Sequence, residues 1–324
     1  METFNGESNW TLTARRDPDG VTLLRCRTCD TRAALPETLW GIPVVGLGTR
    51  AMSPDAPEVA GEQVRIECGT GAGAWDNQAL EVLQLPPGLR RVGDYALYNC
   101  RVLSRLCLWD NVTRWGSGVL VNCRSLERVE IVRPDGTDGG ALAYFAGELN
   151  RELDMTVSRT VSVPLFRLIF PEFRESYEEN CPAHHFDYVI EGVGYPYHHC
   201  FRERRLHFSE YDALWRKSCG VMDTDTACRL AWWRVRYPEG LSGAACENYT
   251  AFLGEHFREV AAWRLSERDS AGLAFLLRRT SPGREALSDV CAAAREQGHT
   301  EAVAFLLDEQ RRRFPVRDKS RFAL

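Results

Sequence analysis

Apolar and polar residues alternate in three short stretches of the chain that lie a constant distance apart. Each stretch places a leucine, valine or isoleucine at every second position, which is typical of a strand with one buried face. The stretches are 82–85, 105–108 and 128–131. The pattern predicts three strands that bury Leu83, Leu106 and Val129 on the same side.

The residues between these strands repeat with an offset of 23 positions. Gly93 corresponds to Gly116, and the dipeptide 99–100 (Asn-Cys) corresponds to 122–123. A degenerate copy at 42–52 matches at an offset of 45, close to twice the repeat. One such unit cannot bury its own apolar side and must stack on a neighbour. We therefore expect a solenoid with both cysteines in its core and both asparagines bonding turn amides.

The repeats resemble a known family. The segment "GVTLLRCRTCDTRAALPETLWGIPVVGLGTRAM", followed by "LPPGLRRVGDYALYNCRVL", is similar to leucine-rich repeats of the BspA type over residues 20–132. The resemblance implies a short strand and a Pro-containing turn in each repeat. Leucine or methionine replaces the usual phenylalanine of the family at Met52, Leu97 and Leu120.

The sequence pattern of the C-terminal third of the chain predicts helices. The stretch "DTDTACRLAWWRVRY" opens with capping residues from Asp223 and stops before Pro238, and Ser281 with Pro282 predicts another helix start. A second repeat, with an offset of 30, aligns 257–277 with 287–307 as two helical pairs. The phrase "AREQGHTEAVAFLLD" resembles the helix pair of an ankyrin repeat, with Gly298 as a left-handed cap.

Between these regions the pattern changes at a Gly-rich loop after Asp135. A helix at 141–149 and a strand pair in "LDMTVS" and "PLFRLIF" are expected to continue or cap the sheet. The words "FPE", "IEG", "CF" and "EYDALW" resemble a linker of BspA-type repeat proteins from gut Firmicutes. The predicted class is α+β, with an N-terminal leucine-rich-repeat β-solenoid followed by a C-terminal α-helical repeat domain. The predicted divisions are 1–134 (repeats), 135–208 (hairpin and linker), 209–314 (helical domain) and 315–324 (tail).

The net charge and the composition limit the classes of partner and the location that we expect for this protein. The 324 residues carry a net charge of -5, so no basic surface for nucleic acid is expected. No apolar run approaches a membrane span, and "METFNGESNW" has no features of a secretory signal. We expect a cytoplasmic protein whose twelve cysteines are reduced.

The stretch "CPAHHFDYVIEGVGYPYHHC" at 181–200 is the main candidate for chemistry. A metal site could be built from side chains at both its ends: Cys181, His184, His185, His198, His199 and Cys200. The spacing fits no zinc pattern, and a strand, a turn and a second strand with the histidines near an edge explain it more simply. Cys26-x-x-Cys29 lacks a second pair to complete a zinc site and a thioredoxin-like setting.

These observations favour a non-catalytic scaffold that binds a protein partner and needs no cofactor. The alternative is an enzyme or metal-binding protein that uses the 181–200 segment. No phosphate loop, H-E-x-x-H or G-x-S-x-G motif is present. The outward strand positions form the predicted protein-binding face: Gln84, Arg105, Trp109, Arg128 and Glu130.

Overall fold

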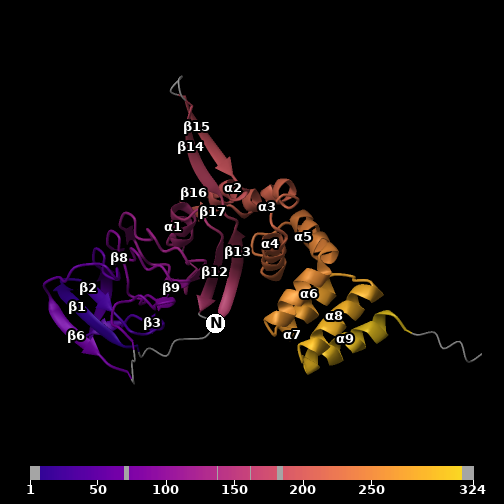
Figure 1. Ribbon diagram of the computed structural model, residues 1–324, viewed down its shortest axis with the longest axis horizontal. Helices are drawn as coiled ribbons and strands as arrows, with labels where there is room; N and C mark the ends of the chain where they lie inside the picture. Colours follow the sequence, from indigo (N-terminus) through magenta and orange to yellow (C-terminus); the bar gives the residue numbers. More distant parts are fainter. Residues whose placement is uncertain (1–7, 69–72, 137, 161, 181–184, 316–324) are drawn as a thin grey trace, which may run out of the picture. The chain divides into compact units, whose positions relative to one another are not determined.

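The structure is a computed structural model that describes residues 8–68, 73–136, 138–160, 162–180 and 185–315, with side chains outside 178–187. It divides into two compact units, 1–214 and 215–324, and helix α3 (Phe208–Ser218) spans the boundary (Figure 1). None of the helices in the described ranges is both long and apolar enough to cross a lipid bilayer.

The first unit contains the predicted stack of parallel strands. In spatial order, the parallel strands within the described residues are β3 (Arg32–Ala34), β7 (Val82–Gln84), β9 (Arg105–Trp109), β11 (Arg128–Val132) and β12 (Leu153–Thr160). Strand β13 (Val163–Phe170) extends the sheet beyond β12 as an antiparallel neighbour. Leu83 pairs with Leu106, and Leu106 pairs with Val129. All three side chains are completely buried, so the step of one repeat per strand is confirmed.

A second sheet forms on the other side of the repeats. Its described strands, in spatial order, are β10 (Arg114–Trp115), β8 (Arg91–Val92), β5 (Ile42–Leu47), β2 (Gly20–Arg27), β1 (Trp10–Asp17) and β6 (Glu62–Ile66), with β4 (Thr38–Leu39) beside β5. Leu47 pairs with Val92, and Val92 pairs with Trp115. The degenerate copy is therefore a true turn of the solenoid.

The turns between the strands stack as closely as the strands do. A Cβ atom on Gly116 would lie only 2.4 Å from the backbone nitrogen of Asp94, so this turn has room for glycine alone. Cys100 and Cys123 are core residues, each 1% exposed, as predicted. The predicted hydrogen-bond partner of Asn122 was wrong. Its side-chain amide donates to the side chain of Asn99, not to a turn amide.

The solenoid ends in an antiparallel pair and a helix. Strand β12 runs parallel to β11 and pairs antiparallel with β13, so the predicted strand pair continues the sheet. Helix α1 (Ala141–Glu148) lies where a helix was predicted. The remaining described elements of this unit are β14 (Arg174–Asn180), β15 (His185–Glu191), α2 (Gly194–His198), β16 (Phe201–Arg202) and β17 (Arg205–Leu206).

The sequence predicted a second strand after Gly192, and this prediction was wrong. No such strand occurs there among the described residues. Strand β15 pairs with β14, which precedes it, and residues 194–198 form helix α2. Pro196 explains the difference because proline cannot donate to a strand ladder but is tolerated in the first turn of a helix. His198, expected near an edge, is only 3% exposed.

The second unit is helical. Its described helices are α4 (Thr224–Arg236), α5 (Gly243–Glu255), α6 (Phe257–Ser266), α7 (Ser270–Arg279), α8 (Arg284–Glu296) and α9 (Thr300–Arg313). Asp223 caps α4 as predicted, accepting hydrogen bonds from the backbone of Asp225 and Thr226. Helix α8 begins two residues later than predicted, with Gly283 at the N-cap and Pro282 buried.

The two helical pairs, α6–α7 and α8–α9, have equivalent connections. The first helix of each pair ends in a residue with positive φ, Arg268 (55°) and Gly298 (71°), which are 30 positions apart. The same pair of backbone hydrogen bonds closes both ends, including 2.9 Å from Asp269 N to Arg264 O and 2.9 Å from His299 N to Ala294 O. These are Schellman caps. The domain divisions at 134/135 and 208/209 stay predictions, and 316–324 of the predicted tail lies outside the described residues.

Candidate protein-binding face

The five residues predicted from the alternation share one face of the strands. Arg105 of β9 and Arg128 of β11 are register partners, and so are Cys107 and Glu130. Gln84 of β7 pairs with Cys107 in turn. Since Leu106 and Val129 point into the core, the alternation of a strand directs these neighbours to the opposite side.

Two of the five residues, Arg105 and Glu130, form an ion pair with each other. Arg105 Nη2 lies 2.6 Å from Glu130 Oε1, and the Cys107 thiol donates a 3.6 Å hydrogen bond to Glu130 Oε2. Glu130 is only 6% exposed. Burial alone would lower the pKa of Arg105, but the hydrogen bond and charge of Glu130 raise it. Glu130 therefore acts as the internal counter-ion of Arg105 and is not a free acid for a partner.

A second ion pair lies further along the same face, and the sequence reasoning missed it. Arg167 Nε of β13 lies 2.6 Å from Asp154 Oδ1 of β12, and the two strands are antiparallel neighbours. Opposite charges on two neighbouring strands of the predicted pair were the available signal in the sequence. The β12–β13 end of the face is thus neutralised from within.

The other predicted residues are more accessible. The Arg128 side chain is exposed, and Gln84 and Trp109 are half-buried. Trp109 pairs in register with Val132 at the carboxyl end of the strands. A half-buried tryptophan and an exposed arginine on one strand face have the composition that protein interfaces favour.

A pocket of about 610 Å³ opens beside Trp109, and it was not predicted from the sequence. The loops that follow β7, β9 and β11 form its walls. Its apolar lining comprises Pro87, Trp109, Val112, Val132 and Pro134. Arg90, Asp110 and Arg133 are among the polar residues that line it.

The polar floor of the pocket is a closed network. The carboxylate of Asp110 binds Arg133 and accepts a 2.9 Å hydrogen bond from the backbone nitrogen of Ala141, at the start of α1. Asp138 holds the other side of Arg133 at 2.7 Å. Two carboxylates therefore neutralise Arg133, and Asp110 connects the loop after β11 to helix α1.

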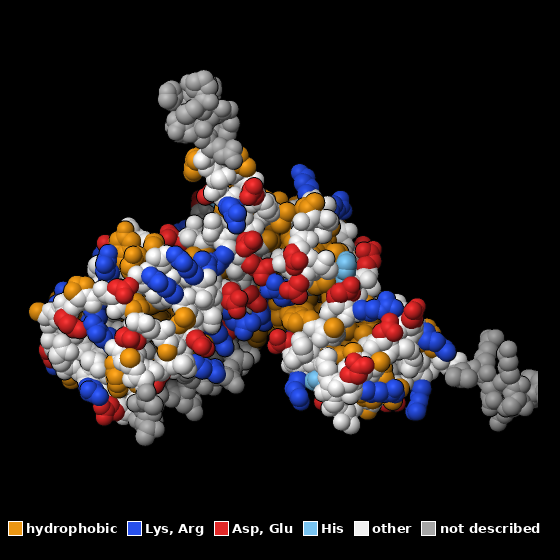
Figure 2. All heavy atoms as spheres, viewed as in Figure 1, with side chains coloured by type: hydrophobic (Ala, Val, Ile, Leu, Met, Phe, Trp, Pro, Cys, Tyr) orange, Lys and Arg blue, Asp and Glu red, His pale blue; other side chains and the backbone are white. Residues whose placement is uncertain are grey.

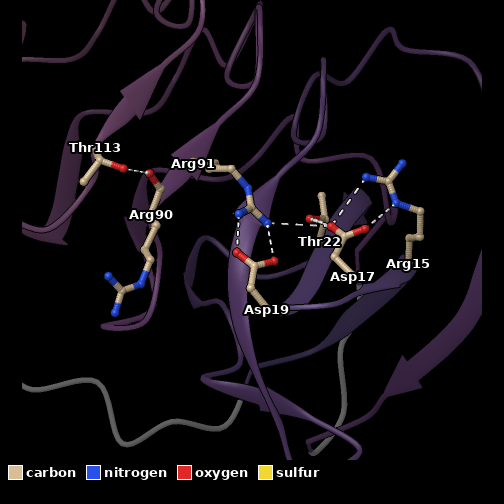
Figure 3. A network of polar contacts seen from close by, with 7 residues as sticks. All are labelled: Arg15, Asp17, Asp19, Thr22, Arg90, Arg91 and Thr113. Carbon is tan, nitrogen blue, oxygen red and sulfur yellow. Dashed lines mark hydrogen bonds and ion pairs between the residues drawn. The ribbon is translucent and has the colours of Figure 1, made fainter.

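The neighbouring arginines Arg90 and Arg91 have different surroundings (Figure 3). The guanidinium of Arg91 binds Asp19 and lies 3.7 Å from Asp17. Hydrogen bonds from Arg15 and Thr22 lower the pKa of Asp17, so this carboxylate stays charged. Arg90 forms its hydrogen bonds through the backbone: its nitrogen donates a 2.9 Å bond to Val45 and its oxygen accepts a 3.2 Å bond from the hydroxyl of Thr113. Its side chain points away from both carboxylates. Its guanidinium is available for binding.

The described histidines and cysteine at the end of the 181–200 segment form hydrogen bonds to backbone oxygens. His198 places Nδ1 2.8 Å from the oxygen of Ala146 and Nε2 2.9 Å from that of Pro171, so each ring nitrogen faces a backbone carbonyl. Cys200 donates its thiol to Pro196 at 3.1 Å. Burial raises the pKa of Cys200 to about 12.

The remaining candidate ligands do not converge on an ion in the described part of the chain. His199 Nδ1 lies 2.7 Å from the backbone oxygen of Tyr195, and the two rings stack. No group of three or more potential metal ligands occurs within the residues that the structure describes. Cys181 and His184 lie outside the described residues, as does the side chain of His185. At the other motif, burial raises the pKa of Cys26, which disfavours a redox thiolate.

Charges of both signs are interspersed over the visible side of the first unit (Figure 2). Known proteins add little to this geometry. No family model and no curated protein match the chain. A crystal structure of a leucine-rich repeat protein from T. pallidum is similar over 49% of this chain and 83% of its own, with 18% identity and a TM-score of 0.23.

A TM-score that low does not establish a shared fold, so the class rests on the strand register. Parallel strands that advance by one repeat define an N-terminal β-solenoid. With its helical C-terminal region the chain is an α+β repeat protein.

Proposed function

We propose that this chain is a non-catalytic scaffold that binds a protein partner through the outward face of β7, β9 and β11. The supporting observation is the in-register ladder that aligns Gln84, Arg105 and Arg128 on one rigid face, with Trp109 at its end. Repeat solenoids expose broad surfaces of this kind for binding. The exposed guanidinium of Arg128 and the indole of Trp109 are the residues expected to contribute most, because arginine and tryptophan dominate interface energies.

Several thiols support a role without catalysis. Burial raises the pKa of Cys107, Cys123 and Cys228 to about 12. A thiol is a nucleophile only as the thiolate, so these side chains stay protonated and inert near neutral pH. They serve as packing residues in both units.

The finer family assignment is part of the proposal. BspA-type repeats are supported by the 23-residue step and by Asn99 and Asn122 at equivalent turns, both with φ of 63°. Ankyrin-like helix pairs are supported by the 30-residue step and the matched Schellman caps. In this assignment the helical unit offers a second surface of stacked helices.

Site-specific crosslinking tests the proposed function. A photoreactive amino acid would replace Arg128 or Trp109 in cells that naturally make the protein, with Val121 as the control position. Val121 is 43% exposed and lies on a turn of the same solenoid, away from the strand face. We expect a discrete partner band from the first two positions and none from Val121. Equal labelling from all three positions, or none from any, would refute the proposal.

A further inference from the structure

We propose that the pocket beside Trp109 receives an apolar side chain of an acidic, extended peptide, and that Arg90 binds a carboxylate next to that side chain. The inference rests on the proposed scaffold function and names the chemistry of the partner segment. The pocket volume of about 610 Å³ lies in the range typical of ligand sites, roughly 300–1,000 Å³.

The walls of the pocket suit an apolar anchor. Trp109 and Val132, which are paired in the strand ladder, form one side. Pro87 from the loop after β7 and Pro134 from the loop after β11 also line the space. An aromatic or branched aliphatic side chain can fill such a space and remove its own apolar surface from water, which is the main source of affinity at interfaces.

The pocket is held open by bonds that do not involve a ligand. The side-chain amide of Asn111 donates to the backbone oxygen of Pro87, which ties the loop after β9 to the loop after β7. The backbone nitrogen of Asp110 donates a 2.9 Å bond to Val132, and Thr113 donates one of 2.9 Å to Arg90. A site that is already formed loses little conformational entropy on binding.

The charge balance of the lining selects an acidic ligand. Arg133 is neutralised by Asp110 and Asp138, and Asp135 already has an interaction partner. Among the charged residues that line the pocket in the described part of the chain, Arg90 alone has an unpaired side chain. A guanidinium binds a carboxylate with two parallel hydrogen bonds, so a neighbouring Asp or Glu is the matching group.

A peptide fits this site better than a free metabolite because the pocket is continuous with the proposed binding face. Trp109 belongs both to the outward row of β9 and to the pocket wall. A chain that lies along the strands therefore passes the indole before its side chain enters the pocket. The exposed Arg128 on the same face would attract further acidic residues of that chain.

Selection from a random peptide library displayed on phage tests the inference with the full-length protein as bait. We expect the enriched peptides to share an aromatic or aliphatic residue flanked by Asp or Glu. Synthetic copies of these peptides should bind wild-type protein and lose roughly tenfold or more in affinity with Arg90→Glu. Arg101→Glu, an exposed arginine on another turn of the solenoid, should bind as wild type does.

A charge swap guards against a folding artefact. Peptides in which Lys replaces the acidic residue should regain affinity for Arg90→Glu while binding wild-type protein weakly. Failure to enrich any peptide, enrichment of basic peptides, or equal binding to Arg90→Glu would overturn the pocket assignment. The scaffold function has an independent readout: crosslinks at Arg128 that persist with Arg90→Glu would keep the scaffold and reject only the pocket.

Discussion

Asn122 donates a 2.8 Å hydrogen bond from its side-chain amide to the side-chain carbonyl of Asn99, one repeat earlier in the solenoid. Both residues have a φ of 63°, a left-handed conformation that asparagine tolerates better than other residues with a side chain. The side-chain amide of Asn99 in turn donates a 2.5 Å hydrogen bond to the carboxylate of Asp55. The turns are thus connected by side chains as well as by the strand ladder.

Substitution of Asn122 separates the two roles of this residue. Asn122→Ala loses the hydrogen bond and forces alanine into positive φ, and should lower the free energy of unfolding by about 2 kcal/mol. Asn122→Gly keeps the backbone conformation accessible and should cost about half as much. Urea unfolding of both variants measures the difference. Equal losses would show that the backbone conformation contributes nothing.

The Arg105–Glu130 pair should be more sensitive to one substitution than to two. Glu130→Met leaves a guanidinium that is largely buried without its counter-ion, at a cost on the order of 3 kcal/mol. The double variant Arg105→Met with Glu130→Met should recover much of that loss, because no unpaired charge remains. A double-mutant cycle by chemical denaturation measures the coupling. Additive losses would contradict an ion pair that matters for stability.

The buried histidine predicts a pH dependence with a definite sign. Burial lowers the pKa of His198 below its ordinary value of 6.5, although the carbonyls of Ala146 and Pro171 oppose the shift. The unfolded chain therefore binds more protons than the folded one as the pH falls below about 6.5, and stability should fall with it. The slope is limited to one proton, about 1.4 kcal/mol per pH unit.

Two variants check this prediction by urea unfolding at several pH values. His198→Gln should flatten the dependence below about pH 6.5, because glutamine does not titrate there. His199→Gln removes a neighbouring charge that helps to lower the pKa of His198, so it should weaken the dependence less than His198→Gln does. An imidazole resonance of His198 that is already protonated at neutral pH in the NMR spectrum would contradict the prediction.

The helical pairs contain a matched test of backbone strain. Arg268 and Gly298 occupy equivalent left-handed caps, but only glycine adopts that conformation without steric cost. Arg268→Gly should raise the free energy of unfolding of the helical unit by about 1 kcal/mol, and Gly298→Ala should lower it by about 1 kcal/mol. Thermal unfolding followed by circular dichroism measures both. Destabilisation by Arg268→Gly would show that the arginine side chain outweighs the strain.

By itself the sequence determined the repeats and their class. A period of two over 105–108 can bury only one face of a strand, and a constant offset of 23 residues leaves each unit with an apolar side that its neighbour must cover. Leu83, Leu106 and Val129 therefore stack as predicted. The offset of 30 gave the helical pairs for the same reason.

Only the tertiary structure decided which side chains of those repeats remain accessible to a partner. The burial of Glu130 against Arg105 and the seating of His198 between two carbonyls depend on neighbours far away in sequence. The pocket beside Trp109 forms where three loops from successive repeats meet, and its free guanidinium exists because Arg91, not Arg90, binds Asp19. Periodicity specifies which side of a strand is buried, but distant contacts in three dimensions specify which polar groups remain unpaired.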